Sequence, residues 1–233
     1  MSTARIRAAA VHAYTASGVL LAFLATMELC STDPDPRVVC LLLALAVLVD
    51  ATDGPLARRW EVKRALPTIE GRTIDDIVDY LTYTFVPLLL VWRMEWVPEP
   101  AAVWITPALI ASLFGFANTG IKDEKGGFFL GFPSYWNVVA FYAGPIAGRY
   151  DPAVNAAILL LLALATLLPI RFLYPNLAPR PWRMPVILGA LLWLGVMLAM
   201  LPDYPRVPAW ALWLSLLYPA FYVGLSFRLA ARR

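Results

Sequence analysis

Long apolar stretches alternate with short polar connections along nearly the whole chain. A helix needs about 20 apolar residues to cross the hydrocarbon of a bilayer, and most of these stretches come close to that length. Strand signals are absent. The pattern therefore predicts an all-α polytopic membrane bundle of eight transmembrane helices. We expect them over residues 12–29, 38–57, 74–91, 101–120, 134–148, 152–172, 184–201 and 209–227, with Gly131 and Phe132 extending the short fifth helix.

The composition excludes a soluble enzyme. Of the 233 residues, 61% are hydrophobic and only 15% are charged, and the mean hydropathy is +0.67. By comparison, about a quarter of the residues in a soluble domain are charged. Eight helices of about 20 residues occupy roughly 160 positions, which leaves no room for a separate aqueous domain. We therefore expect a single integral-membrane domain over residues 1–233, with any chemistry on the bundle itself.

The positive charges are sorted by side of the membrane. Fifteen of the nineteen lysines and arginines fall at the termini or in connections on one side, and four fall on the other: Arg37, Arg93, Arg149 and Arg206. Because cytoplasmic loops carry the excess of lysine and arginine, both termini and the loop over residues 58–72 are predicted to be cytoplasmic. The net charge of +3 thus reflects topology and attraction to anionic headgroups, and it does not indicate nucleic-acid binding.

Acidic residues are concentrated at the predicted cytoplasmic ends of the second and third helices. Seven of the sixteen lie between Asp50 and Asp79. On a helix, Asp50 and Asp53 project from one face, as do Asp75 and Asp79, whereas Asp76 points about 100° away from Asp75. Four converging carboxylates at membrane depth would repel one another unless cations lay between them. Oxygen ligands suit Mg²⁺ or Mn²⁺, and two such ions form a clamp for displacement at phosphorus.

Small residues and one arginine accompany these acids. Gly54 and Ala57 lie one turn apart beside the first pair, and Gly71 lies one turn before Asp75. Missing side chains let a ligand approach the backbone, although small residues also permit close packing of membrane helices. Arg58 adds a planar guanidinium that can hold phosphate oxygens.

Together these residues form the pattern DxxDGxxARx(8 to 12)GxxxDxxxD, which resembles the signature of the CDP-alcohol phosphotransferase family. The resemblance implies a core of six helices, often in a homodimer, with a polar site open to the cytoplasm and to lipid. It implies that Asp50, Asp53, Asp75 and Asp79 ligate two divalent cations, and that Asp79 is the catalytic general base. It further implies that the cytidine and diphosphate parts of a CDP-linked donor bind at Gly54, Ala57, Arg58 and Gly71. The chain's only histidine, His12, is distant from this motif in the sequence, which favours a carboxylate base.

Within that family, nearly the whole chain is similar to the bacterial phosphatidylcholine synthases, notably over residues 122–142. This resemblance implies transfer of the phosphatidyl group of CDP-diacylglycerol to choline at the inner membrane, with Mn²⁺ or Mg²⁺. Choline carries a quaternary ammonium group, which aromatic faces and nearby carboxylates recognise. The candidate choline-binding residues are Tyr80, Tyr83, Phe128, Phe132, Tyr135, Trp136 and Glu70.

Other functions share some of these features. A related transferase with serine, inositol phosphate or glycerol phosphate as acceptor is the nearest alternative. An intramembrane prenyltransferase also binds a diphosphate through aspartates and metal, but its acidic motifs have a different spacing and come in two sets. A cation transporter could contain clustered intramembrane acids, although here they all lie at one face and no matching broken helix appears in the other half.

Overall fold

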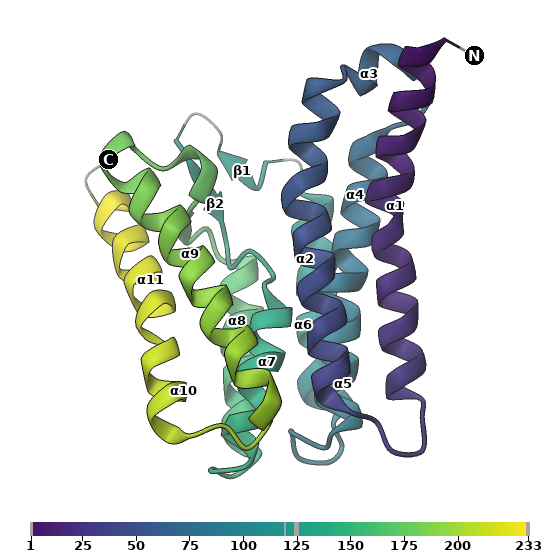
Figure 1. The fold of residues 1–233 in the computed structure, drawn as a ribbon. Coiled ribbons are helices and arrows are strands. Elements are labelled where there is room, and N and C mark those ends of the chain that lie inside the picture. Colours follow the sequence, from purple (N-terminus) through teal and green to yellow (C-terminus); the bar gives the residue numbers. More distant parts are fainter. Residues whose placement is uncertain (1, 119, 124–125, 232–233) are drawn as a thin grey trace.

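The computed structural model describes residues 2–118, 120–123 and 126–231, which form a bundle of long helices with one small sheet (Figure 1). The first part of the chain contains α1 (Thr3–Leu29), α2 (Pro36–Arg59), α3 (Val62–Ala65), α4 (Gly71–Asp79), η1 (Tyr80–Phe85), α5 (Val86–Arg93) and α6 (Ala102–Ala117). The second part contains α7 (Trp136–Ala147), α8 (Ala153–Leu167), η2 (Pro175–Leu177), α9 (Arg180–Met200), η3 (Leu201–Asp203), α10 (Ala209–Ser215) and α11 (Leu217–Ala230). Both termini lie at the same end of the bundle.

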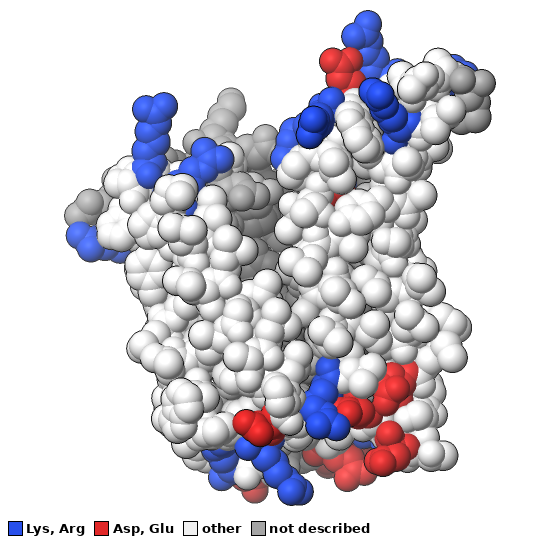
Figure 2. All heavy atoms as spheres, in the orientation of Figure 1, with Lys and Arg blue, Asp and Glu red and all other residues white. Residues whose placement is uncertain are grey.

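The helices confirm the predicted all-α polytopic membrane bundle. Within the described residues, four helices are long and apolar enough to cross a membrane, over Thr3–Leu29, Pro36–Arg59, Arg180–Asp203 and Ala209–Ala230. Two shorter apolar helices, α6 and α8, lie where the fourth and sixth spans were expected. In the view of Figure 2, charged side chains gather at the two ends of the molecule and are nearly absent between them. The protein is therefore embedded in the membrane, and on this face the surface between its two ends carries almost no charge.

One large hydrophobic core joins helices from both parts of the chain. It contains Ala22 and Ala25 of α1, Ala108 of α6, Ala140 of α7, and Val86, Leu88, Leu90 and Val91 of α5. Small residues at these contacts allow the helix backbones to approach closely, which supplies the van der Waals packing that holds a membrane bundle together. This core fixes α1, α2 and the third span relative to one another, and these are the segments that carry the acidic residues.

The third span changes its winding directly after Asp79. The α-helix α4 ends there, the segment η1 is a π-helix, and α5 resumes the α-helical winding. Pro87, in the first turn of α5, explains the change because its ring would clash with the carbonyl group of Tyr83 and because it has no N–H to donate. A π-helical turn widens the backbone locally and is frequent at functional sites. Here it sets the direction of Tyr83.

The prediction that the chain has no strands was wrong. A three-stranded antiparallel sheet joins two loops, in the order β1 (Lys122–Asp123), β2 (Phe128–Leu130) and β3 (Arg171–Leu173), and Phe129 pairs with Phe172. The sheet lies against α11, where the backbone amide of Leu173 in β3 donates a hydrogen bond to the Ser226 hydroxyl at 3.0 Å. These pairings satisfy backbone groups of loops that lie close to the bilayer.

The fifth helix is shorter than predicted. It begins at Trp136, so Gly131 and Phe132 do not extend it. Gly131 adopts a φ of 88°, a left-handed conformation that favours glycine, and its amide donates to the Ile170 carbonyl at 2.7 Å. The Phe132 amide donates to the Ala165 carbonyl at 3.0 Å. The chain therefore turns across the end of α8 before α7 starts.

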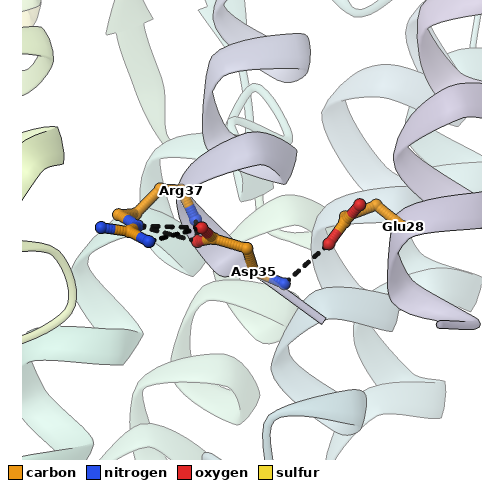
Figure 3. Close-up of polar contacts among 3 residues, drawn as sticks. All are labelled: Glu28, Asp35 and Arg37. Atoms are coloured by element: carbon orange, nitrogen blue, oxygen red, sulfur yellow. Dashed lines mark hydrogen bonds and ion pairs between the residues drawn. The ribbon is translucent and has the colours of Figure 1, made fainter. Parts of the chain in front are cut away.

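Polar contacts organise the loop between α1 and α2, far along both helices from the acidic motif (Figure 3). Asp35 is the N-cap of α2, and its side chain accepts a hydrogen bond from the Arg37 amide at 2.8 Å and binds the Arg37 guanidinium at 2.7 Å. Its own amide donates to Glu28 at 2.8 Å. The hydrogen bond from Arg37 holds the pKa of the Asp35 carboxyl below its ordinary value of 3.8.

We expect Asp35→Ala to lower the free energy of unfolding by about 1 kcal/mol, because an aspartate N-cap is worth roughly that much. The effect should be complete above pH 3.8, where the carboxyl is ionised in both folded and unfolded chains, and should disappear as the pH falls through the lowered folded pKa. Denaturant unfolding of purified protein in detergent measures it. Asp33→Ala, at an exposed position in the same loop, is the control and should have little effect. Equal losses for the two variants would contradict the capping role.

Candidate metal centre

Three of the four predicted metal ligands meet in the structure. Asp50 of α2 and Asp75 and Asp79 of α4 each offer a carboxylate oxygen, and these three oxygens lie within 4.8 Å of one another. All three residues are half-buried. The i, i+4 spacing places Asp75 and Asp79 on one face of α4, and the packing of the first three spans brings that face to Asp50. The trio can therefore hold a metal ion.

The electrostatics of the trio favour such an ion. Three carboxylates at this separation repel one another strongly in a medium of low dielectric constant. Hydrogen bonding offsets part of this cost at one position, where the Tyr83 hydroxyl donates to Oδ2 of Asp50 at 2.7 Å. A hard divalent cation with oxygen ligands, such as Mg²⁺ or Mn²⁺, fits the donor set. The π-helical turn that follows Asp79 thus places a hydrogen-bond donor beside the acids.

Asp53 and Asp76, the other two aspartates between residues 50 and 79, do not belong to the trio. Asp53 is buried, with 5% of its surface exposed, but it is not one of the three residues whose oxygens converge. Asp76 also lies outside the trio and instead faces Arg72, with 3.6 Å between its Oδ2 and the arginine Nε. This contact agrees with the helical geometry, which directs Asp76 away from Asp75.

The predicted donor-binding residues flank the trio on α2. A Cβ atom on Gly54 would lie 3.4 Å from Nη1 of Arg58, so the arginine side chain extends back over the glycine. Arg58 is exposed, and Gly54 is half-buried. Ala57 packs with the small cluster formed by Ala8, Val11 and Val62. On α2, next to the trio, the Arg58 guanidinium group therefore lies over the backbone of Gly54, which no other side chain of the described residues covers.

Gly71, the remaining predicted donor-binding residue, has a neighbour that the sequence did not reveal. A Cβ atom on Gly71 would lie 3.0 Å from Cε1 of His12, so the imidazole packs directly on the first residue of α4. Nε2 of His12 is buried and has no hydrogen-bond partner among the described residues. A buried polar nitrogen without a partner is costly. His12 is therefore part of the site's surroundings, although it lies 59 positions before Gly71 in the sequence.

The predicted aromatic residues divide into two groups. Tyr83 and Tyr135 lie beside the acids: their ring centroids are 6.2 Å apart, and the Tyr135 hydroxyl interacts electrostatically with both Asp50 and Asp79. Phe132 continues this group, with its ring centroid 6.4 Å from that of Tyr135. Tyr174, which the sequence reasoning missed, also interacts electrostatically with the Tyr135 hydroxyl. Its position follows from the sheet, which brings the two loops together.

The other four candidate choline-binding residues have contacts away from the acidic trio. The Tyr80 hydroxyl donates to the Leu109 carbonyl at 3.2 Å, and its ring contacts Phe116. Trp136 is fully buried and donates to the Ser112 hydroxyl at 2.6 Å. Phe128 belongs to a separate core with Leu173, Ala178, Val186 and Leu225. Glu70 is exposed at the start of α4, and its side chain makes no capping hydrogen bond.

Comparison with known proteins shows the family to which the chain belongs. No protein-family model matches the chain. A phosphatidylcholine synthase of Pseudomonas aeruginosa is 43% identical over 172 residues, which cover 73% of this chain and 70% of that protein. A phosphatidylcholine synthase of Rhizobium johnstonii is 34% identical over 222 residues, which cover 94% of this chain and 88% of that protein. The chain belongs to the phosphatidylcholine synthase family.

A third relative agrees with this assignment. A phosphatidylcholine synthase of Legionella bozemanae is 32% identical over 193 residues, which cover 80% of this chain and 88% of that protein. Membership of the phosphatidylcholine synthase family confirms the predicted resemblance, the predicted synthase function and the assignment as a transferase of phospholipid synthesis. The prenyltransferase, the cation transporter and the transferases with other acceptors are not favoured.

Proposed function

We propose that the acidic site transfers the phosphatidyl group of CDP-diacylglycerol to choline. The hydroxyl oxygen of choline attacks the phosphorus that carries the diacylglycerol. The bond from that phosphorus to the bridging oxygen of the diphosphate breaks, CMP leaves with the bridging oxygen, and phosphatidylcholine remains. The observation that carries this proposal is the convergence of Asp50, Asp75 and Asp79 in this chain, which belongs to the phosphatidylcholine synthase family.

Asp50, Asp53, Asp75 and Asp79 would hold two divalent cations, Mn²⁺ or Mg²⁺. When bound, these cations supply positive charge beside the diphosphate and the departing CMP. Three members of this set already meet, and Asp53 lies one turn from Asp50 on the same helix. Arg58 and the open backbone at Gly54 would orient the diphosphate, because a guanidinium group pairs with two phosphate oxygens at once.

Asp79 would take the proton of the choline hydroxyl. It is the last residue of α4, so it stands where the acidic face meets the π-helical turn and its tyrosine. Tyr83 and Tyr135 would face the quaternary ammonium group, with the negative charges of Asp50 and Asp79 nearby. Choline cannot donate a hydrogen bond from its ammonium group, so aromatic faces and carboxylates are the chemistry that recognises it.

Gly71, Ala57 and His12 would border the cytidine end of the donor. Gly71 lacks a side chain where the His12 ring packs, and the buried Nε2 of His12 offers a hydrogen-bonding atom for a nucleotide. Ala57 keeps the end of α2 close to α1.

The site would open to the cytoplasm from a bacterial inner membrane. Fifteen of the nineteen lysines and arginines fall on the side that carries both termini, as the positive-inside rule requires of a cytoplasmic face. The family resemblance further implies a homodimer, which sedimentation in detergent would test.

The acceptor assignment is tested with purified protein, CDP-diacylglycerol and Mn²⁺. We expect labelled choline to be incorporated into phosphatidylcholine with release of one CMP per product, and we expect chelation by EDTA to stop turnover. Serine, inositol phosphate and glycerol phosphate serve as competing acceptors. Product from one of these and none from choline would refute the proposal.

A further inference from the structure

A basic pocket, separate from the acidic trio, lies at the end of the bundle that carries both termini. It has a volume of about 580 Å³ and lies between the start of α1, the end of α2 and α3. Figure 2 shows the blue side chains that gather at this end around a red one. None of the aspartates of the acidic motif lines this pocket. Its charged and aromatic lining residues are Arg5, Arg7, Arg59, Arg64, Trp60 and Glu61.

The lining carries an excess of positive charge. Four arginines and one glutamate give a net charge of +3. Glu61 is engaged by Arg64, with 3.2 Å between Nη1 and Oε2. The other three arginines make no ion pair with any residue in the described part of the chain. The pocket is therefore suited to an anion that several guanidinium groups can share.

The pocket lies at the depth of lipid headgroups. At about 1.5 Å per residue, the 27 residues of α1 extend about 40 Å, whereas the hydrocarbon of a bilayer is about 30 Å thick. The first turns of α1, which carry Arg5 and Arg7, therefore extend beyond the hydrocarbon. Trp60 occupies the same level, and tryptophan prefers the interface between lipid and water.

The floor of the pocket is held in place by packing. Trp60 packs on the buried cluster of Ala8, Val11 and Val62, which joins α1 to α3. Glu61 turns the chain from α2 into α3 with a φ of 48°, an uncommon conformation for a residue other than glycine. The four arginines thus project from three helices, α1, α2 and α3, which this packing and this turn hold together.

We propose that this pocket binds the phosphate group of an anionic glycerophospholipid of the surrounding membrane. Membrane depth favours a lipid over a soluble phosphate, and the net charge of +3 favours an anionic headgroup over the zwitterionic choline headgroup, whose ammonium group the arginines repel. A lipid bound there holds the start of α1 against α3, beside the helices that carry the acids. The inference stands independently of the proposed reaction.

Native mass spectrometry of the purified protein in neutral detergent tests this site. The probes are dioleoyl phosphatidylglycerol and dioleoyl phosphatidylcholine. We expect wild-type protein to retain phosphatidylglycerol in preference to phosphatidylcholine. Arg5→Gln/Arg7→Gln should weaken the binding of phosphatidylglycerol at least about tenfold, since each arginine near an anionic lipid contributes on the order of 1 kcal/mol.

The matched control is Arg183→Gln/Arg228→Gln, which removes two exposed charges at the same end of the bundle but outside the pocket. It should bind phosphatidylglycerol as wild type does. Equal loss in both double variants would overturn the proposal, as would equal retention of the two lipids by wild type. Displacement of phosphatidylglycerol by an equal concentration of inorganic phosphate would also overturn it, in favour of a soluble ligand. Thermal unfolding in lipid-free detergent verifies that each variant is folded.

Discussion

Asp79→Asn is expected to abolish turnover, with kcat lowered by about 10³-fold or more, while CDP-diacylglycerol binding is largely retained. An amide cannot accept the hydroxyl proton of choline, and loss of a general base costs about 10²–10⁴-fold. The substitution also weakens one ligand of the acidic trio, whose oxygens lie within 4.8 Å of one another. Initial rates of CMP release, together with equilibrium binding of the donor, separate the loss of chemistry from a loss of binding.

Asp76→Asn is the matched control, because it changes the same chemical group on the same helix. Asp76 lies outside the trio and faces Arg72 across 3.6 Å, with 32% of its side chain exposed. Exposed pairs of this kind contribute about 0–1 kcal/mol, so the control should retain most of its activity. Equal losses of turnover in Asp79→Asn and Asp76→Asn would contradict the conclusion that only the face of α4 with Asp75 and Asp79 carries the reaction.

Tyr135→Leu is expected to raise the KM for choline by about 30-fold and to change the KM for CDP-diacylglycerol little. A cation over an aromatic face in a desolvated site gains about 2 kcal/mol, which corresponds to that factor. Tyr135 is suited to this role because its ring lies 6.2 Å from that of Tyr83 and its hydroxyl is within electrostatic range of Asp50 and Asp79. Steady-state kinetics with each substrate varied in turn measures both constants.

Two further variants separate a ring contact from general damage. Tyr135→Phe keeps the aromatic face and should keep the KM for choline close to that of wild type. Tyr80→Leu removes a ring that contacts Phe116 instead of the acids, and it should leave the KM for choline unchanged. A choline KM that rises equally in Tyr80→Leu and Tyr135→Leu would refute the aromatic site, and so would a phenylalanine variant as impaired as the leucine variant.

Much of the acidic site could be predicted because its geometry is local. The spacing of Asp75 and Asp79 fixes a common helical face, and the short connection between the second and third spans brings that face near Asp50. The apolar stretches likewise predicted the positions of the long helices, since burial in lipid leaves few alternatives to a helix. The placement of Asp76 away from the trio follows from the same helical periodicity.

The remaining features depend on contacts between distant segments. His12 reaches Gly71 because α1 packs beside α4, and no periodicity in either segment encodes that pairing. The sheet depends on hydrogen bonds between two loops, which a search for alternating strands does not detect. Pro87 was a usable signal for the altered winding at Tyr83, because a proline inside an apolar helix disturbs the turn before it.

The sheet separates two parts of the proposed site along the chain. Tyr135 follows a connection whose strands are tied to β3 and, through it, to α11, whereas the aspartates come from α2 and α4. The parts proposed for phosphorus chemistry and for choice of alcohol thus belong to different stretches of polypeptide. Substitutions in the connection or in the last helix are therefore expected to change which alcohol is accepted and to leave the reaction centre on α2 and α4 in place.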